Sequence, residues 1–198
     1  MNTPNHEALI RRVLGGNYLE LKLSKLSFEE NDGAAGTVRV VVQEGEQLVE
    51  VDGKGVGVVD ALYEGLIRRY AREYQSLATL QLVKFSVDAD FTTKQGKAGV
   101  DAIGKVTLDV ENSEGSLFSF TDGSRSVTTS IARVVLAMVQ YFVNAERAFL
   151  TLHHARQDAQ QRGREDLVSR YTAEMAEVVE STSYADVIAN IKKQLPKP

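Results

Sequence analysis

The sequence predicts an α+β fold in which two strand-strand-strand-helix (βββα) units, each a sheet and helix in two layers, precede a helical C-terminal extension. Two segments resemble each other: residues 23–28 read Leu-Ser-Lys-Leu-Ser-Phe and residues 82–87 read Leu-Val-Lys-Phe-Ser-Val. Alternating apolar runs and then a stretch of helical periodicity follow each copy. Beyond about residue 150, charged helix-forming residues predominate.

The distance between the copies grows along the chain. It is 59 residues at the first strand, 68 at the second and 70 at an Asp-Gly pair, Asp52-Gly53 against Asp122-Gly123. A longer first loop and a longer hairpin turn in the second copy explain the growth. Each unit presents one apolar face that needs a partner, so the seam between the units is a natural place for a ligand.

The first unit follows a short lead-in helix over 5–14, which Gly15-Gly16 should end. The first strand alternates from Leu19, and its phase slips at Ser24-Lys25, which indicates a bulge or a strong twist. A hairpin around Glu44-Gly45 and a helix should follow. The predicted hairpin strands and helix are 38–42, 48–51 and 59–74.

The second unit repeats this order. Its first strand, 80–87, slips in phase at Lys84. A long polar loop is predicted over 88–104, rich in Lys, Gly and Thr. The hairpin strands and the long helix of this unit are then predicted over 106–110, 117–120 and 131–149.

These elements predict a division of the chain into a duplicated domain, 1–150, and a helical extension, 151–198. The two units of the domain span approximately 17–75 and 79–149. In the extension, apolar residues at helical spacing predict two amphipathic helices, over 167–179 and 184–195.

Composition excludes several classes of function. The net charge of −4 gives no global electrostatic case for nucleic acid. The absence of cysteine excludes disulfides, thiolate metal sites and a Cys nucleophile. The charged N-terminus is unlike a secretory signal, and no run of about 18 apolar residues suggests a membrane span. We therefore expect a cytoplasmic protein with no nucleic-acid or membrane partner.

Two glycine-containing motifs indicate a family. The first strand-to-helix junction reads Gly55-Val56-Gly57-Val58-Val59-Asp60-Ala61, and Gly99-Val100-Asp101-Ala102-Ile103-Gly104 precedes a strand of the second unit. Over roughly residues 17–149, the chain resembles the C-terminal regulatory domain of 2-isopropylmalate synthase and citramalate synthase. That domain typically has Gly-x-Gly-Pro-Val-Asp-Ala and Gly-Thr-Asp-Ala at these places.

The resemblance implies a homodimeric domain that binds a branched-chain amino acid, leucine or isoleucine, between its units near the helix N-termini. In the family this domain follows a catalytic (β/α)8 barrel, which the present sequence lacks. The resemblance therefore predicts a stand-alone, non-catalytic regulator of leucine biosynthesis that acts on a synthase in trans. Val58 replaces the family's Pro and Val100 its Thr. At the second junction Arg125 follows Ser124 where the family has Asp or Asn.

The residues also make a physical case for a zwitterionic ligand. Gly55 and Gly57 would let the backbone approach a small molecule, and the following helix N-terminus would attract a carboxylate. Asp101 would take an ammonium group, and small apolar neighbours would hold an alkyl chain. The alternative is that the glycines only form a tight turn and Asp60 is a first-turn helix anion. The candidate ligand-binding residues are Gly55, Gly57, Val59, Asp60, Ala61, Asp101, Ala102, Ser124 and Arg125.

No catalytic, metal or cofactor site is predicted. His154 and Asp158 lie one helical turn apart, but no third ligand is evident and a solvated helix face explains them. The sequence contains no P-loop or Ser-His-Asp nucleophile pattern. Two functions stay open: an amino-acid sensor, or a dimeric interaction scaffold that kept the fold and lost the ligand.

Overall fold

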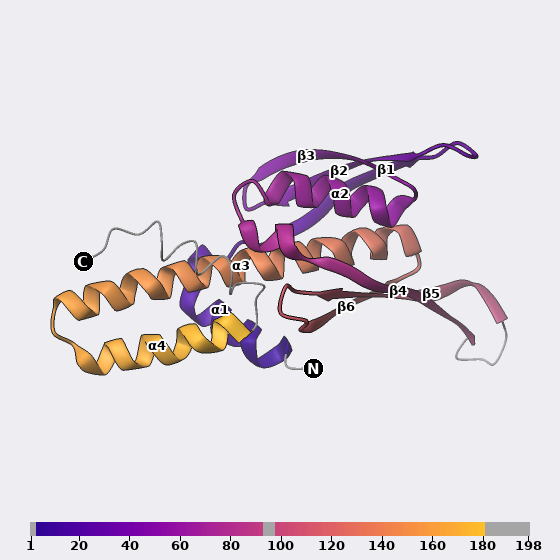
Figure 1. Ribbon diagram of the computed structural model, residues 1–198. Helices are drawn as coiled ribbons and strands as arrows, with labels where there is room; N and C mark the ends of the chain where they lie inside the picture. The colour runs from indigo at the N-terminus through magenta and orange to yellow at the C-terminus, as the bar shows by residue number, and fades with distance from the viewer. Residues whose placement is uncertain (1–2, 93–97, 181–198) are drawn as a thin grey trace.

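A computed structural model describes residues 3–92 and 98–180, with side chains over 6–88 and 103–179 (Figure 1). The first unit comprises β1 (Leu21–Glu29), β2 (Gly36–Glu44), β3 (Gln47–Gly55) and α2 (Val58–Tyr70). The second comprises β4 (Gln81–Thr92), β5 (Ala98–Glu111), β6 (Leu117–Ser124) and α3 (Val127–Gln161). The remaining elements are α1 (Thr3–Leu14), η1 (Gly15–Asn17), η2 (Gln75–Thr79) and α4 (Glu165–Glu180). The predicted α+β fold with two βββα units is confirmed.

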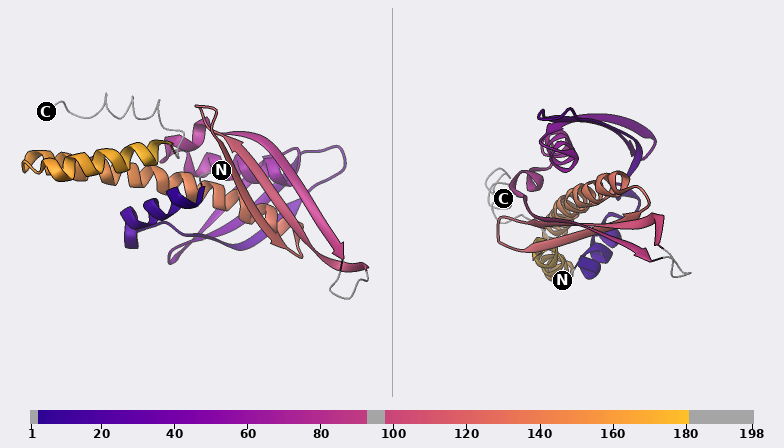
Figure 2. Two further views of the ribbon diagram at one scale, coloured as in Figure 1. Left: turned by 90° about the horizontal axis from the view of Figure 1, so that it is seen from below. Right: turned by 90° about the vertical axis from the view of Figure 1, so that its right-hand side faces the viewer.

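The two units face each other across their helices. Each sheet is antiparallel, with the orders β1-β2-β3 and β4-β5-β6. Helix α2 packs on β2 and β3, whereas α3 packs on β5 and β6 and also contacts β1 of the other unit. Both helices therefore lie between the sheets, as the right-hand view of Figure 2 shows. In Figure 1 they run side by side and both begin at the right-hand end.

A bulge lies at each of the two phase slips. The register of β1 against β2 shifts between Leu23 and Lys25, and that of β4 against β5 shifts between Leu82 and Lys84. A bulge adds one residue to one strand, so the side chains that follow return to the core face. This explains why the apolar residues change parity at the same place in both copies.

The long polar loop predicted over 88–104 is wrong. Strand β4 continues to Thr92 and β5 begins at Ala98, and the ladder includes the pair Asp88↔Lys105. Alternation of apolar and polar residues reveals a strand only where one of its faces is buried. Backbone pairing extends this hairpin beyond the core, where the sequence carries no such pattern. The first-unit helix also ends earlier than predicted, at Tyr70, so that Tyr74 lies outside it.

The structure aligns the third strands of the two units at an offset of 69. The N-cap residues of α2 and α3 are Gly57 and Ser126, and Gly53 and Asp122 occupy equivalent ladder positions. The two Asp-Gly pairs, 70 residues apart, are therefore one residue out of register with each other. Because strand side chains alternate between faces, Asp52 lies on the outer face of its sheet and Asp122 on the inner face.

Helix α3 extends across the predicted division at residue 150 and ends at Gln161. Its C-terminal half packs against α4 and the lead-in helix α1. The predicted helices at 5–14 and 167–179 correspond to α1 and α4, while the one at 184–195 lies outside the described residues. A second apolar cluster joins the three helices: Leu9, Phe149, Leu152, Met175 and Val178. Helix α3 is long and apolar enough to pass for a membrane span, but 67% of that apolar window is buried inside the protein.

Candidate ligand site at the strand-to-helix junctions

The first junction is a close contact between β3 and α2. A Cβ atom added to Gly53 would lie 1.9 Å from the carbonyl oxygen of Ala61, and one added to Gly55 would lie 2.5 Å from the Ala61 nitrogen. On the helix, a Cβ on Gly65 would lie 2.8 Å from the carbonyl oxygen of Asp52. Ala61 itself is fully buried. Small residues therefore bring the helix and strand together, which fixes where the N-terminus of α2 lies.

The N-terminus of α2 has no side-chain cap. Gly57 is the N-cap residue, and a Cβ atom there would meet nothing within 4 Å. Asp60 turns its carboxylate back to the preceding loop, where Oδ2 accepts a hydrogen bond from the backbone N–H of Val56 at 2.9 Å. Asp60 thus supports the helix as a first-turn anion, as one of the two sequence readings proposed. A cap at Gly57 would be left to a ligand or to water.

The second junction has its own cap. Ser126 is the N-cap of α3. Its hydroxyl oxygen accepts a hydrogen bond from the Thr129 N–H at 3.3 Å and another from the Thr129 hydroxyl at 2.9 Å. The Ser124 hydroxyl donates to the carbonyl oxygen of Ser126 and pairs with the Ser130 hydroxyl, both at 2.8 Å. Three serines therefore satisfy one another at the start of α3.

The two junctions solve the same packing problem in different ways. At the offset of 69, Ser124 and Ser130 correspond to Gly55 and Ala61, so that a hydroxyl pair replaces a glycine-alanine contact. Asp122 corresponds to Gly53. Its Oδ2 atom is buried without a hydrogen bond, and Nη1 of Arg133 lies 3.9 Å from it. The β6–α3 junction is consequently more polar than the β3–α2 junction.

The fold brings most of the predicted site residues to one end of the domain. Residues 55–61 form the β3–α2 junction, and Ser124 and Arg125 form the β6–α3 junction beside it (Figure 1). Val59 is half-buried on α2 and Arg125 is exposed. Asp101 and Ala102 belong to β5 by backbone, and their side chains lie outside the described residues.

Sequence reasoning missed two features of this end. Val56 is 86% exposed, the largest exposure among the large apolar side chains in the described residues. Its position in a Gly-x-Gly loop could have indicated this, because flanking glycines provide no side chains to cover it. The Ser126 cap was also missed, although Ser followed three residues later by a polar residue is a common helix start.

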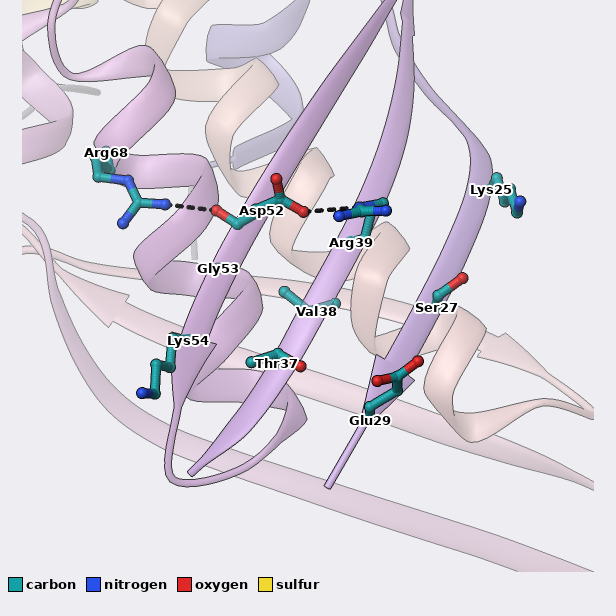
Figure 3. A pocket seen from close by; sticks show the side chains of 10 residues that line it. All are labelled: Lys25, Ser27, Glu29, Thr37, Val38, Arg39, Asp52, Gly53, Lys54 and Arg68. Carbon is teal, nitrogen blue, oxygen red and sulfur yellow. Dashed lines mark hydrogen bonds and ion pairs between the residues drawn. The ribbon is translucent and has the colours of Figure 1, made fainter. Parts of the chain in front are cut away.

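A separate groove of about 620 Å³ lies on the outer face of the first sheet (Figure 3). Two of its arginines bind Asp52: Arg39 Nε donates to the carboxylate oxygen Oδ1 at 2.9 Å, and Arg68 donates to the backbone carbonyl at 2.6 Å. The bond to Asp52 raises the pKa of Arg39. None of the predicted site residues lines this groove, which is lined by Lys25, Ser27, Glu29, Thr37, Val38, Arg39, Asp52, Gly53, Lys54 and Arg68.

Within the part of the chain that the structure describes, no three His, Asp or Glu side chains gather closely enough to hold a metal ion. Comparison with curated proteins finds no match for this chain. A protein-family model does match it: residues 3–143 fit the LeuA allosteric (dimerisation) domain. The match covers both βββα units up to the middle of α3 and includes both junctions. The chain therefore belongs to the LeuA allosteric (dimerisation) domain family.

Proposed function

We propose that this protein is a non-catalytic, homodimeric regulatory module of the cytoplasm that senses a branched-chain amino acid. As a separate polypeptide it would regulate a synthase of the isopropylmalate or citramalate type in trans. Family membership supports the regulatory and dimerising part of this proposal. A ligand would act by binding two states of the dimer with different affinities.

The observation that carries the sensing role is the uncapped N-terminus of α2. Gly57 supplies no side-chain acceptor, whereas Ser126 supplies one to α3. An amino-acid carboxylate would accept hydrogen bonds from the first-turn N–H groups and interact favourably with the helix dipole. The exposed Val56 and half-buried Val59 offer apolar contacts for an alkyl side chain in the same place.

Isothermal calorimetry with leucine, isoleucine, valine and alanine tests the sensing role. We expect saturable heat with one branched-chain ligand and none with alanine. Gly57→Asp should abolish that heat, because its carboxylate would cap α2 and repel the ligand carboxylate. The free energy of unfolding should stay within a few tenths of a kcal/mol, because Gly and Asp are both accepted at N-caps.

Gly57→Ala is the matched control for this variant. It adds a Cβ atom into open space without a charge, so ligand affinity should stay within a few-fold of the parent. Equal ligand affinity in Gly57→Asp and the parent protein would place any ligand elsewhere. Loss of binding in both variants would indicate a steric effect and not competition by a carboxylate.

A second candidate function is a dimeric interaction scaffold without a ligand. The internal satisfaction of the junctions favours it: Asp60 binds the Val56 N–H, and Ser124 pairs with Ser130. A folded dimer that gives no heat with any of the four amino acids would support the scaffold and contradict the sensor.

A further inference from the structure

The edge strand β4 exposes an unusual amount of apolar surface. Of the eight large apolar side chains that are exposed among the described residues, four lie within residues 82–87. They are Leu82 (38% exposed), Val83 (53%), Phe85 (40%) and Val87 (42%). Edge strands are usually protected by charges, proline or a covering element, because their free backbone groups invite pairing with another chain.

The first unit shows what normally covers this surface. At the offset of 59, the residues of β1 that correspond to Leu82, Phe85 and Val87 are Leu23, Leu26 and Phe28. All three β1 residues pack against the hydrophobic core, and β1 contacts α3. Their β4 equivalents lie on the same face as Val106 and Leu108, but all three are exposed.

Side chains of α3 also form hydrogen bonds with the backbone at the start of β1. The Leu21 N–H donates to the side-chain oxygen of Gln140 at 2.7 Å, and Asn144 binds both backbone groups of Leu19. Among the described residues, no side chain of a helix makes such a hydrogen bond to the backbone of β4 between residues 82 and 88. Within the described part of the chain, β4 is therefore the edge with both an apolar face and no covering element.

We propose that two copies of this chain associate by antiparallel pairing of β4 with β4 of the other copy, around a twofold axis at Ser86. This deepens the homodimer of the proposed function and rests on it. The strand is suited to the pairing because its register against β5 is unbroken from Lys84 to Asp90. The two three-stranded sheets would join into one sheet of six strands.

Charge complementarity supports this register. Antiparallel pairing about Ser86 places Lys84 of each copy opposite Asp88 of the other, which gives two symmetric ion pairs. It also places Phe85 opposite Val87, an aromatic–β-branched combination that stabilises adjacent strands. These Phe and Val side chains lie on the inner face of the sheet, so pairing would cover part of the apolar surface that is otherwise exposed.

Charge reversal tests the register directly. Lys84→Asp and Asp88→Lys would each place like charges opposite each other at two positions, and we expect each to weaken the dimer roughly tenfold or more. The double variant Lys84→Asp/Asp88→Lys restores both opposite-charge pairs and should recover parental affinity. The dimer dissociation constant is measured by sedimentation equilibrium at one salt concentration.

Mixing the two single variants provides a second readout. Their heterodimer has complementary charges at both positions, so the mixture should dimerise more tightly than either variant alone. The matched control is Lys25→Asp, a charge reversal at the exposed position of β1 that corresponds to Lys84 at the offset of 59, which should leave the dissociation constant unchanged. Circular dichroism confirms that each variant is folded.

The outcomes separate this inference from the proposed function. A dimer whose affinity is unchanged in both Lys84→Asp and Asp88→Lys overturns the β4 pairing, while amino-acid binding measured by calorimetry can still support the sensor. Weakening without recovery in the double variant overturns the Ser86-centred register. A protein that is monomeric at micromolar concentration overturns both the pairing and the homodimer.

Discussion

Replacing Gly53 by alanine should strongly destabilise the protein, because the added methyl group has no space. The new Cβ atom would lie 1.9 Å from the carbonyl oxygen of Ala61 and 3.1 Å from the Cα atom of Gly65. Both are backbone atoms of α2, so the strand and the helix must separate by more than 1 Å to reach ordinary van der Waals contact. Overpacking of a core usually costs about 1–3 kcal/mol, and a clash with backbone belongs at or above the upper end.

Gly123→Ala is the matched control, since Gly123 belongs to the other Asp-Gly pair. A Cβ atom there would lie 3.5 Å from Cγ2 of Ile103, which is an ordinary contact, and the residue is exposed. We expect its free energy of unfolding to stay within about 0.5 kcal/mol of the parent.

Urea denaturation at a fixed protein concentration measures both variants, since association makes stability depend on concentration. For a chain of this size, a loss of 3 kcal/mol should also lower the melting temperature by roughly 6–12 °C. Equal destabilisation by Gly53→Ala and Gly123→Ala would refute the reasoning, because it would show that the distance to α2 does not set the cost.

Asn144 is fully buried on α3 and binds both the N–H and the carbonyl of Leu19 at 2.8 Å. Asn144→Ala should therefore lower the free energy of unfolding, measured by urea denaturation, by about 2 kcal/mol. A loss below about 0.5 kcal/mol would contradict this. Burial raises the pKa of Tyr63 from 10.0 to about 12. Its contribution to stability is therefore complete below about pH 10 and lost as the pH rises through about 12, and Tyr63→Phe should flatten this part of the pH–stability curve; an unchanged curve would exclude Tyr63 as the cause. Asp101→Ala should abolish amino-acid binding in calorimetry with an unchanged circular dichroism spectrum, and unaltered affinity would refute its role.

Local pattern was sufficient for the order of elements. Apolar alternation and helical spacing predicted the two βββα units, and the changes of parity at Lys25 and Lys84 marked the places where the structure has its bulges. These features depend on neighbouring residues in the chain, so one sequence read along its length contains them. The extension of β4 and β5 into residues 88–104 was missed, because pairing between polar strands depends on the partner strand.

The candidate site was likewise predicted only in part from the sequence. The Gly-x-Gly junction motif and the family resemblance were evident in the sequence, and the family is confirmed over residues 3–143. The sequence did not reveal which residues of the two third strands are equivalent. A one-residue difference in offset leaves the sequence match almost unchanged but moves every side chain to the other face of the sheet. The pairing of Ser124 with Ser130 follows from that equivalence and was not predicted.

The sequence by itself determined the periodicities, the duplication, the breaks in phase and the motif that identifies the family. Only the tertiary structure decided which glycines contact a helix, which helix N-terminus lacks a cap, and that β1 is covered whereas β4 is exposed. The physical reason is that a strand residue has one set of neighbours along the chain and another across space. Packing distance and exposure depend on the second set, which forms only when the two units come together.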